Sequence, residues 1–199
     1  MKLKFLYPAM LMVAFLEGGV LMAFEILSSK MYTPYLGSSI YVWTSILTLT
    51  LSGLALGYKI GGKLSVERPT NYLIYVLLIA SVLIGISPLI APIVLESLLL
   101  IDVKTASIIG GFILIFIPVI ALGIVSPLIV GILEKNGTTI PHATGVVYGI
   151  GTLGGILFLL ITTFYLIPKI GVMCSTFLMS GILLLATIGV FKFMKRANA

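Results

Sequence analysis

Residues 107–133 read SIIGGFILIFIPVIALGIVSPLIVGIL, a run without a single charged side chain. A helix needs about 20 mainly apolar residues to cross the hydrocarbon core of a bilayer. This run is long and apolar enough to do so, and it is therefore typical of a membrane-spanning helix. Pro118 and Pro127 inside it predict a kink or a strong tilt.

Similar apolar runs lie on both sides of this one, and together they predict six membrane-spanning helices. We expect these helices at about residues 5–27, 39–60, 72–95, 107–133, 145–167 and 172–191. Pro88 and Pro92 predict a break near the end of the third, with residues 96–104 as a short interfacial stretch. The polar segments between the runs are short, so we expect one all-α integral membrane domain over residues 1–199.

The composition of the chain supports lipid as its solvent. Hydrophobic residues make up 60% of the sequence and charged residues only 9%, whereas soluble domains carry about 25% charged residues. The net charge of +6 could indicate nucleic acid binding. We exclude that class because the basic residues form no dense cluster and instead lie in short segments between apolar runs.

The basic residues predict the orientation of the bundle. If the six runs alternate across the membrane, nine of the 12 Lys and Arg residues lie on the side of the N-terminus and three on the other side. The three are Lys30, Lys104 and Lys169. Since cytoplasmic segments carry the excess of Lys and Arg, we expect both termini in the cytoplasm of a multi-pass protein of the cell membrane.

Glycines at a spacing of four predict close packing between helices. Such spacing places glycines on one helix face, where the missing side chains let two backbones approach in lipid. The candidates for helix packing are Gly53, Gly57, Gly61, Gly151, Gly154 and Gly155. Packing within one chain is the simplest interpretation, and a moving interface or a contact between two copies remains open.

Two carboxylates within the first apolar run are the clearest polar signal. Glu17 lies near its middle and Glu25 near its end, about 12 Å apart along a helix axis and rotated by about 80°. A charged group at the bilayer centre costs ~2.5–3.5 kcal/mol on insertion scales, so it normally faces the bundle interior and has a partner. Because no Lys or Arg lies deep in any run, either a neutral carboxyl or a mobile cation is expected at Glu17. A purely structural carboxylate remains the alternative, and Glu25 could pair with Lys30 at the interface.

The sequence carries no motif for soluble-type catalysis, for a phosphate-binding loop or for zinc. One cysteine, Cys174, cannot form a disulfide within the chain. We therefore expect no enzyme activity, no cofactor and no metal site.

Two stretches of the sequence carry a family resemblance. The first, residues 25–68, matches the pattern of a glutamate, a PY-[LF]-G-S-S loop, a tryptophan and an LGY-x-x-GG-x-L helix end. The second, residues 145–172, matches G-x-x-Y-x-x-x-T-L-G-[GS]-[IL]. The matching residues are Glu25, Pro34, Tyr35, Gly37, Ser38, Ser39, Trp43, Gly57, Tyr58, Gly61, Gly62, Gly145, Tyr148, Thr152, Leu153, Gly154 and Gly155. The chain thus resembles the membrane domain of spermidine-synthase-like membrane proteins, which is similar to half of a major-facilitator carrier.

This resemblance implies a carrier-like module for a small cationic solute of the polyamine type. It adds Tyr35 and Trp43, which belong to the matched motif, to Glu17 and Glu25 as candidate cation-binding residues. Fused family members also carry a cytoplasmic aminopropyltransferase domain, whose residues are not present here, so its chemistry is not expected. The alternative is a membrane subunit without transport of its own, which would anchor a separate soluble aminopropyltransferase-like enzyme or another membrane partner. By analogy with half-size carriers, a homo-oligomer is the expected assembly.

Overall fold

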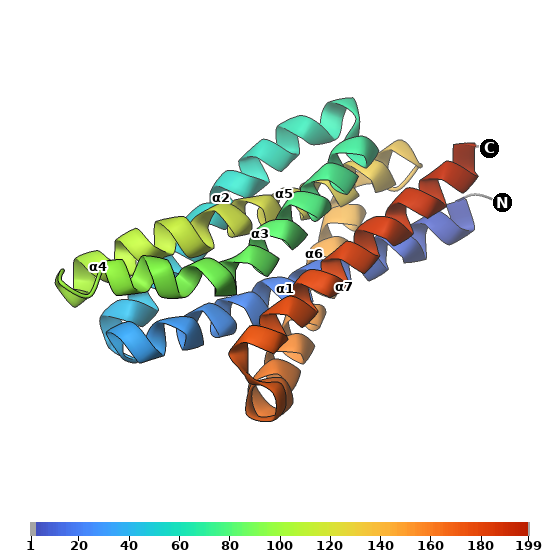
Figure 1. The fold of residues 1–199 in the computed structure, drawn as a ribbon. Helices are drawn as coiled ribbons and strands as arrows, with labels where there is room; N and C mark the ends of the chain where they lie inside the picture. Colours follow the sequence, from blue (N-terminus) through green and yellow to red (C-terminus); the bar gives the residue numbers. More distant parts are fainter. Residues whose placement is uncertain (1–2, 199) are drawn as a thin grey trace.

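The chain folds as a bundle of long helices (Figure 1). The computed structural model describes residues 3–198, and that range contains no β-strand. The elements are α1 (Leu3–Leu36), α2 (Ile40–Glu67), α3 (Pro69–Ser97), α4 (Val103–Gly111), η1 (Phe112–Phe116), α5 (Ile117–Lys135), α6 (Ile140–Ile161), η2 (Thr162–Leu166) and α7 (Ile167–Asn198). The π-helical segments η1 and η2 join the α-helices around them without a gap. The predicted all-α class is therefore confirmed.

Five helical stretches are long and apolar enough to cross a membrane. They are Leu6–Leu36, Ile40–Glu67, Pro69–Ser97, Val103–Lys135 and Ile140–Lys195. The first four correspond to the first four predicted spans. The fifth stretch contains both of the last two predicted spans, so length and composition alone give five spans and not six.

Gly171 interrupts this last stretch. Its backbone, at φ 78° and ψ 174°, is not helical, and glycine is the residue that adopts such a conformation without steric cost. Figure 1 shows the chain descending through α6 and returning upward through α7 after this point. The break lies between residues 167 and 172, where the two predicted spans were separated.

Several helices extend beyond the predicted spans. Residues 28–38 were expected to connect two spans, yet α1 continues to Leu36 because Tyr32 and Leu36 are buried against neighbouring helices. Only Arg68 separates α2 from α3. The break expected at Pro88 and Pro92 does not occur, since α3 continues through both. Packing against other helices overrides the local preference of these residues.

Proline instead changes the helix type in two other places. The π-helical segment η1 ends two residues before Pro118, and η2 ends two residues before Pro168. A proline lacks the backbone N–H and its ring crowds the carbonyl four residues earlier, and a wider turn before it is one way to accommodate both. The irregularity expected at Pro118 is therefore a π-helical turn.

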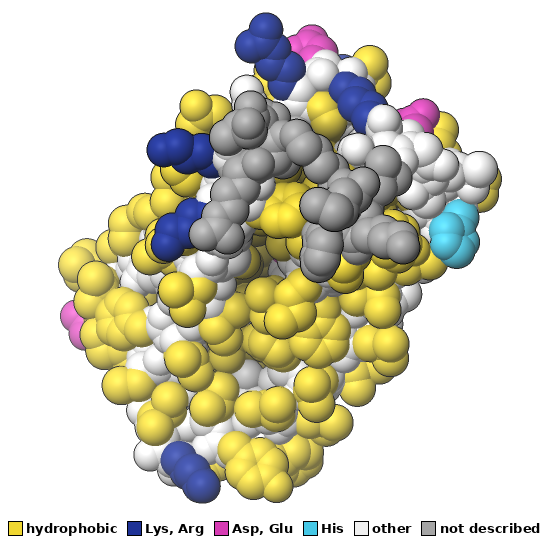
Figure 2. Space-filling view, turned by 90° about the vertical axis from the view of Figure 1, so that its right-hand side faces the viewer, with side chains coloured by type: hydrophobic (Ala, Val, Ile, Leu, Met, Phe, Trp, Pro, Cys, Tyr) yellow, Lys and Arg dark blue, Asp and Glu magenta, His cyan; other side chains and the backbone are white. Residues whose placement is uncertain are grey.

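Both termini lie at the same end of the bundle (Figure 1). Among the described side chains, six basic residues lie toward this end and three toward the other. The six are Lys59, Lys63, Arg68, Lys135, Lys192 and Lys195. Figure 2 looks onto this end and shows Lys and Arg side chains around it, with hydrophobic side chains over the flank below. Lys2, Lys4 and Arg196, which were counted for the same end, lie outside the described side chains.

Polar contacts fix the connections at both ends. At the end with the termini, the Lys135 ammonium on α5 donates hydrogen bonds of 2.7 Å to the carbonyls of Val66 and Glu67. These two carbonyls in the last turn of α2 thus have a hydrogen-bond donor. At the other end, Asp102 caps α4 by accepting from the N–H groups of Thr105 and Lys104 at 3.1 Å each. Hydrogen bonding to Thr105 is the main cause that lowers the pKa of the exposed Asp102 carboxyl below its ordinary value.

Two glycine-lined seams join the helices in pairs. Between α2 and α5, a Cβ on Gly57 would lie 2.5 Å from the Ile120 carbonyl oxygen, and one on Gly61 would lie 2.7 Å from that of Ile124. Gly53 is packed less tightly, because a Cβ on it would lie 3.1 Å from Cγ1 of Val119. Between α1 and α6, a Cβ on Gly154 would overlap the Phe15 carbonyl oxygen. Both seams therefore bring backbone against backbone.

A third crossing, between α3 and α7, uses hydroxyl groups. Ser81 donates to the Ser180 carbonyl at 2.9 Å, and Ser180 donates to the Ser81 carbonyl at 2.7 Å. Such reciprocal bonds are a recognised way to join helices where the hydrophobic effect gives no driving force.

A matched pair of substitutions on α2 tests the first seam. We expect Gly57→Ala to destabilise the protein by about 1–3 kcal/mol, as overpacking of a close-packed core does. Gly62→Ala, with nothing within 4 Å of the new Cβ, should leave stability unchanged or raise it by up to about 1 kcal/mol through helix propensity. Thermal unfolding of the detergent-purified variants measures both. Equal melting temperatures for the two variants would contradict close backbone packing between α2 and α5 at Gly57.

Candidate functional site

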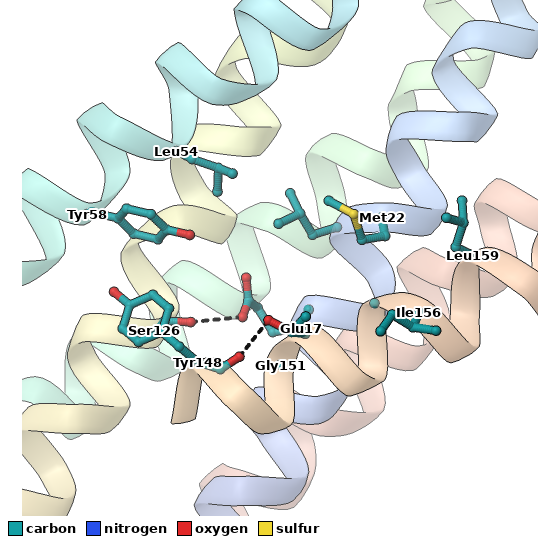
Figure 3. Close-up of a pocket in the computed structure, with 13 residues that line it drawn as sticks. Glu17, Met22, Leu54, Tyr58, Ser126, Tyr148, Gly151, Ile156 and Leu159 are labelled. Atoms are coloured by element: carbon teal, nitrogen blue, oxygen red, sulfur yellow. Dashed lines mark hydrogen bonds between the residues drawn. The ribbon is translucent and has the colours of Figure 1, made fainter. Parts of the chain in front are cut away.

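A cavity of about 330 Å³ lies between α1, α2, α5 and α6 (Figure 3). This volume falls at the lower end of the range for small-molecule pockets, about 300–1,000 Å³. Its lining combines one carboxylate with hydroxyl groups, glycines and apolar side chains. The lining residues are Glu17, Gly18, Leu21, Met22, Leu54, Tyr58, Ser126, Tyr148, Gly151, Thr152, Gly155, Ile156 and Leu159.

Glu17 is the acidic group of the cavity. It lies 14 residues after Leu3 and 19 before Leu36, and thus near the middle of α1. Only 4% of its surface is exposed, and its Oε2 accepts a hydrogen bond of 3.1 Å from the Ser126 hydroxyl on α5. No Lys, Arg or His is among the residues that line the cavity. The carboxylate therefore has a hydrogen-bond donor and no fixed countercharge at this site.

Two tyrosines line one side of the cavity. The rings of Tyr58 on α2 and Tyr148 on α6 meet edge to face, with centroids 5.6 Å apart and planes at 79°. Figure 3 shows the Tyr58 hydroxyl directed toward Glu17 and Ser126. This pair bridges two helices that do not pack closely, since the Cα atoms of α2 and α6 stay more than 8 Å apart throughout the described residues. Tyr58 on α2 and Ile156 on α6 line the cavity and are 37% and 54% exposed, so the cavity is open on the side between α2 and α6.

Glycines both form the walls of the cavity and create its space. A Cβ on Gly18 would overlap the Gly151 carbonyl oxygen, so α1 and α6 touch directly beside Glu17. A Cβ on Gly155 would lie 2.8 Å from Cγ of Met22. Because Gly18, Gly151 and Gly155 all line the cavity, the seam that positions Glu17 also leaves room beside its carboxylate.

The structure separates the four residues that the sequence suggested as a cation site. Glu17 lines the cavity, and Glu25, Tyr35 and Trp43 do not. Glu25 is half-buried two turns farther along α1, and Tyr35 and Trp43 are half-buried beside the α1–α2 connection. No single cavity joins all four. Of the packing glycines, Gly151 and Gly155 line the cavity, whereas Gly53, Gly57, Gly61 and Gly154 serve the helix contacts only.

Among the cavity residues that were not predicted as site residues, four carry a hydroxyl group: Tyr58, Ser126, Tyr148 and Thr152. A signal for two of them exists, because Tyr148 and Thr152 are one helical turn apart and share a face with Gly151 and Gly155. Ser126 is a polar residue at mid-span beside Pro127, which is a weaker signal. Tyr58 could not be distinguished by sequence from a tyrosine at the membrane interface.

The chemistry of the site follows from its single carboxylate. No group of three His, Cys, Asp or Glu side chains within the described part of the chain is arranged to hold a metal ion. What the cavity offers is one carboxyl group, neighbouring hydroxyls and two aromatic rings. Such a set attracts a cation, through charge at the carboxylate and through the ring faces.

The fold indicates the class of protein to which the chain belongs. Helices this long and apolar, with little charged surface between them, make the chain a multi-pass α-helical membrane protein. No protein-family model matches the chain, and neither a curated protein nor a solved structure matches it. The resemblance to spermidine-synthase-like membrane proteins therefore rests on the motifs quoted above and stays a prediction.

Thiol labelling tests whether water reaches the cavity. With the exposed Cys174 replaced by Ser, we compare Thr152→Cys, which lines the cavity, with Leu153→Cys, whose side chain is 58% exposed on the outside of the bundle. The cysteine thiolate attacks methanethiosulfonate reagents, forming a mixed disulfide and releasing methanesulfinate, and the thiolate forms in water and not in lipid. We expect Cys at position 152 to react faster than Cys at position 153. Equal rates in membranes would contradict a hydrated cavity.

Proposed function

We propose that this chain is a carrier-like membrane module that binds a small cationic solute at Glu17. The observation that carries the proposal is a buried carboxylate in an open cavity with no basic residue among the lining side chains. The fold places this group at mid-depth of the bundle, where binding sites of carriers are commonly found.

The energetics favour a cation as the missing partner. An ionised carboxylate at the bilayer centre costs several kcal/mol unless it is paired, and the one hydrogen bond from Ser126 offsets only part of that cost. A mobile cation supplies the remaining compensation. A proton could fill the same role, and the experiment on Glu17 below separates the two.

We further propose six membrane crossings with both termini in the cytoplasm. The non-helical Gly171 and the reversal of the chain between α6 and α7 support dividing the last apolar stretch into two spans. The excess of six basic side chains over three at the end with the termini supports its cytoplasmic orientation.

Reporter fusions test this topology. Alkaline phosphatase is active only outside the cytoplasm, and green fluorescent protein fluoresces only inside it. We expect fusions after residues 137 and 199 to give fluorescence, and a fusion after residue 171 to give phosphatase activity. Fluorescence from the fusion at 171 would show that residues 140–195 do not cross the membrane twice.

A pair of charge-neutral substitutions on α1 tests the cation site. We expect Glu17→Gln to reduce binding of a cationic solute at least about tenfold, or about 1.4 kcal/mol, because the amide keeps the shape and removes the charge. Glu25→Gln, which lies outside the cavity, should leave binding within about threefold of the wild type. Binding to protein in lipid nanodiscs and uptake into proteoliposomes are the two measurements.

If Glu17→Gln and Glu25→Gln bind the solute equally well, Glu17 is a structural carboxylate. If Glu17→Gln alters only proton movement across the proteoliposome membrane and no organic cation binds, the partner is a proton and the proposal of a solute site is wrong.

A further inference from the structure

We propose that the cavity selects a cation with one charge and an apolar body, and not a polyamine. This inference rests on the proposed function, since it narrows the ligand class of the same site. The motif resemblance points toward polyamines, which carry several positive charges along a flexible chain. The lining of the cavity does not offer partners for several charges.

The first argument is the number of charges. Glu17 is the single carboxylate among the residues that line the cavity. Glu25, two turns farther along α1, does not line it. A second ammonium group bound here would have no anionic partner. An unpaired charge among apolar groups is strongly unfavourable, so each added charge on a ligand should weaken its binding.

The second argument is the character of the surface around Glu17. Leu54 on α2, Met22 on α1 and Ile156 on α6 surround the cavity in Figure 3, together with Leu159. These side chains suit a hydrocarbon body, and the flexible Met22 adapts to different shapes. Polar groups are concentrated near the carboxylate, at Ser126 and Tyr58. One end of a ligand is thus expected to be charged and the other end apolar.

The third argument is the position of the opening. Met10 and Ala14 are buried on one side of Glu17 along α1, and Phe24 and Leu27 on the other. This face of α1 is therefore packed against other helices on both sides of the cavity. The open side lies between α2 and α6, where the Cα atoms stay more than 8 Å apart and Ile156 is 54% exposed.

This sideways opening faces the surface that lipid would cover. A solute that enters there must partition into the membrane, as a monocation with an apolar body does. A polyamine remains in water, because its several charges are costly to bring into the hydrocarbon region. The Tyr58–Tyr148 pair lies at the opening, where its ring faces attract a desolvated ammonium group.

Two amines of equal chain length test the inference. Hexylamine carries one ammonium group, and hexamethylenediamine carries one at each end of the same hydrocarbon chain. We expect the diamine to bind wild-type protein in nanodiscs at least about tenfold more weakly than hexylamine. Hexanol, which has the same chain without the charge, should not compete with hexylamine. Isothermal titration calorimetry against empty nanodiscs corrects for partition into the lipid.

The variants separate failure of the inference from failure of the proposed function. We expect Glu17→Gln to abolish the preference for hexylamine over hexanol, and Glu25→Gln to retain it. Tighter binding of hexamethylenediamine or spermidine that depends on Glu17 would overturn the single-charge inference and leave the cation site in place. Hexylamine binding that is the same in wild type and Glu17→Gln would overturn both.

Discussion

The direct contact of backbones at the glycine seams is the constraint on which the rest of this structure depends. In lipid, apolar side chains gain little from leaving one hydrocarbon environment for another, so helices need close packing or hydrogen bonds to associate. Between α1 and α6, Gly18 meets Gly151; between α2 and α5, Gly57 meets Gly123. These two helix pairs are also the four helices that form the cavity. The packing of the bundle and the position of Glu17 thus have the same cause.

The π-helical segments show how the sequence tolerates proline within such a bundle. Both η1 and η2 end two residues before a proline, while α3 continues as an α-helix through Pro88 and Pro92. A proline frees a carbonyl one turn earlier, and in a membrane that carbonyl must find another donor or a locally altered turn. The same residue type therefore has different consequences in different helices.

The apolar runs could be predicted from sequence because a membrane-spanning helix needs only length and hydrophobicity. Helix ends could not, since residues 28–36 are polar enough for a loop and become helical through the burial of Tyr32 and Leu36. Glu17 was identified because a carboxylate in an apolar run is costly wherever it lies. Its neighbours in the cavity were not, because Ser126, Tyr58 and Tyr148 come from three other helices, and their meeting depends on tertiary packing. Glu25 satisfies the same sequence criterion as Glu17, and only the fold shows that it lies outside the cavity.

The packing of α1 on both sides of Glu17 helps to distinguish among the ways in which a membrane protein can use a buried carboxylate. A channel needs a continuous path through the bundle, whereas α1 is closely packed on both sides of Glu17, where Met10, Ala14, Phe24 and Leu27 are buried. A structural carboxylate needs partners enough to satisfy it, and Glu17 has the Ser126 hydroxyl beside an open cavity. A binding site needs an opening, a charge and a surface complementary to the rest of the ligand. The space between α2 and α6, the carboxylate and the apolar walls supply these three features, which favours binding over conduction as the role of this bundle.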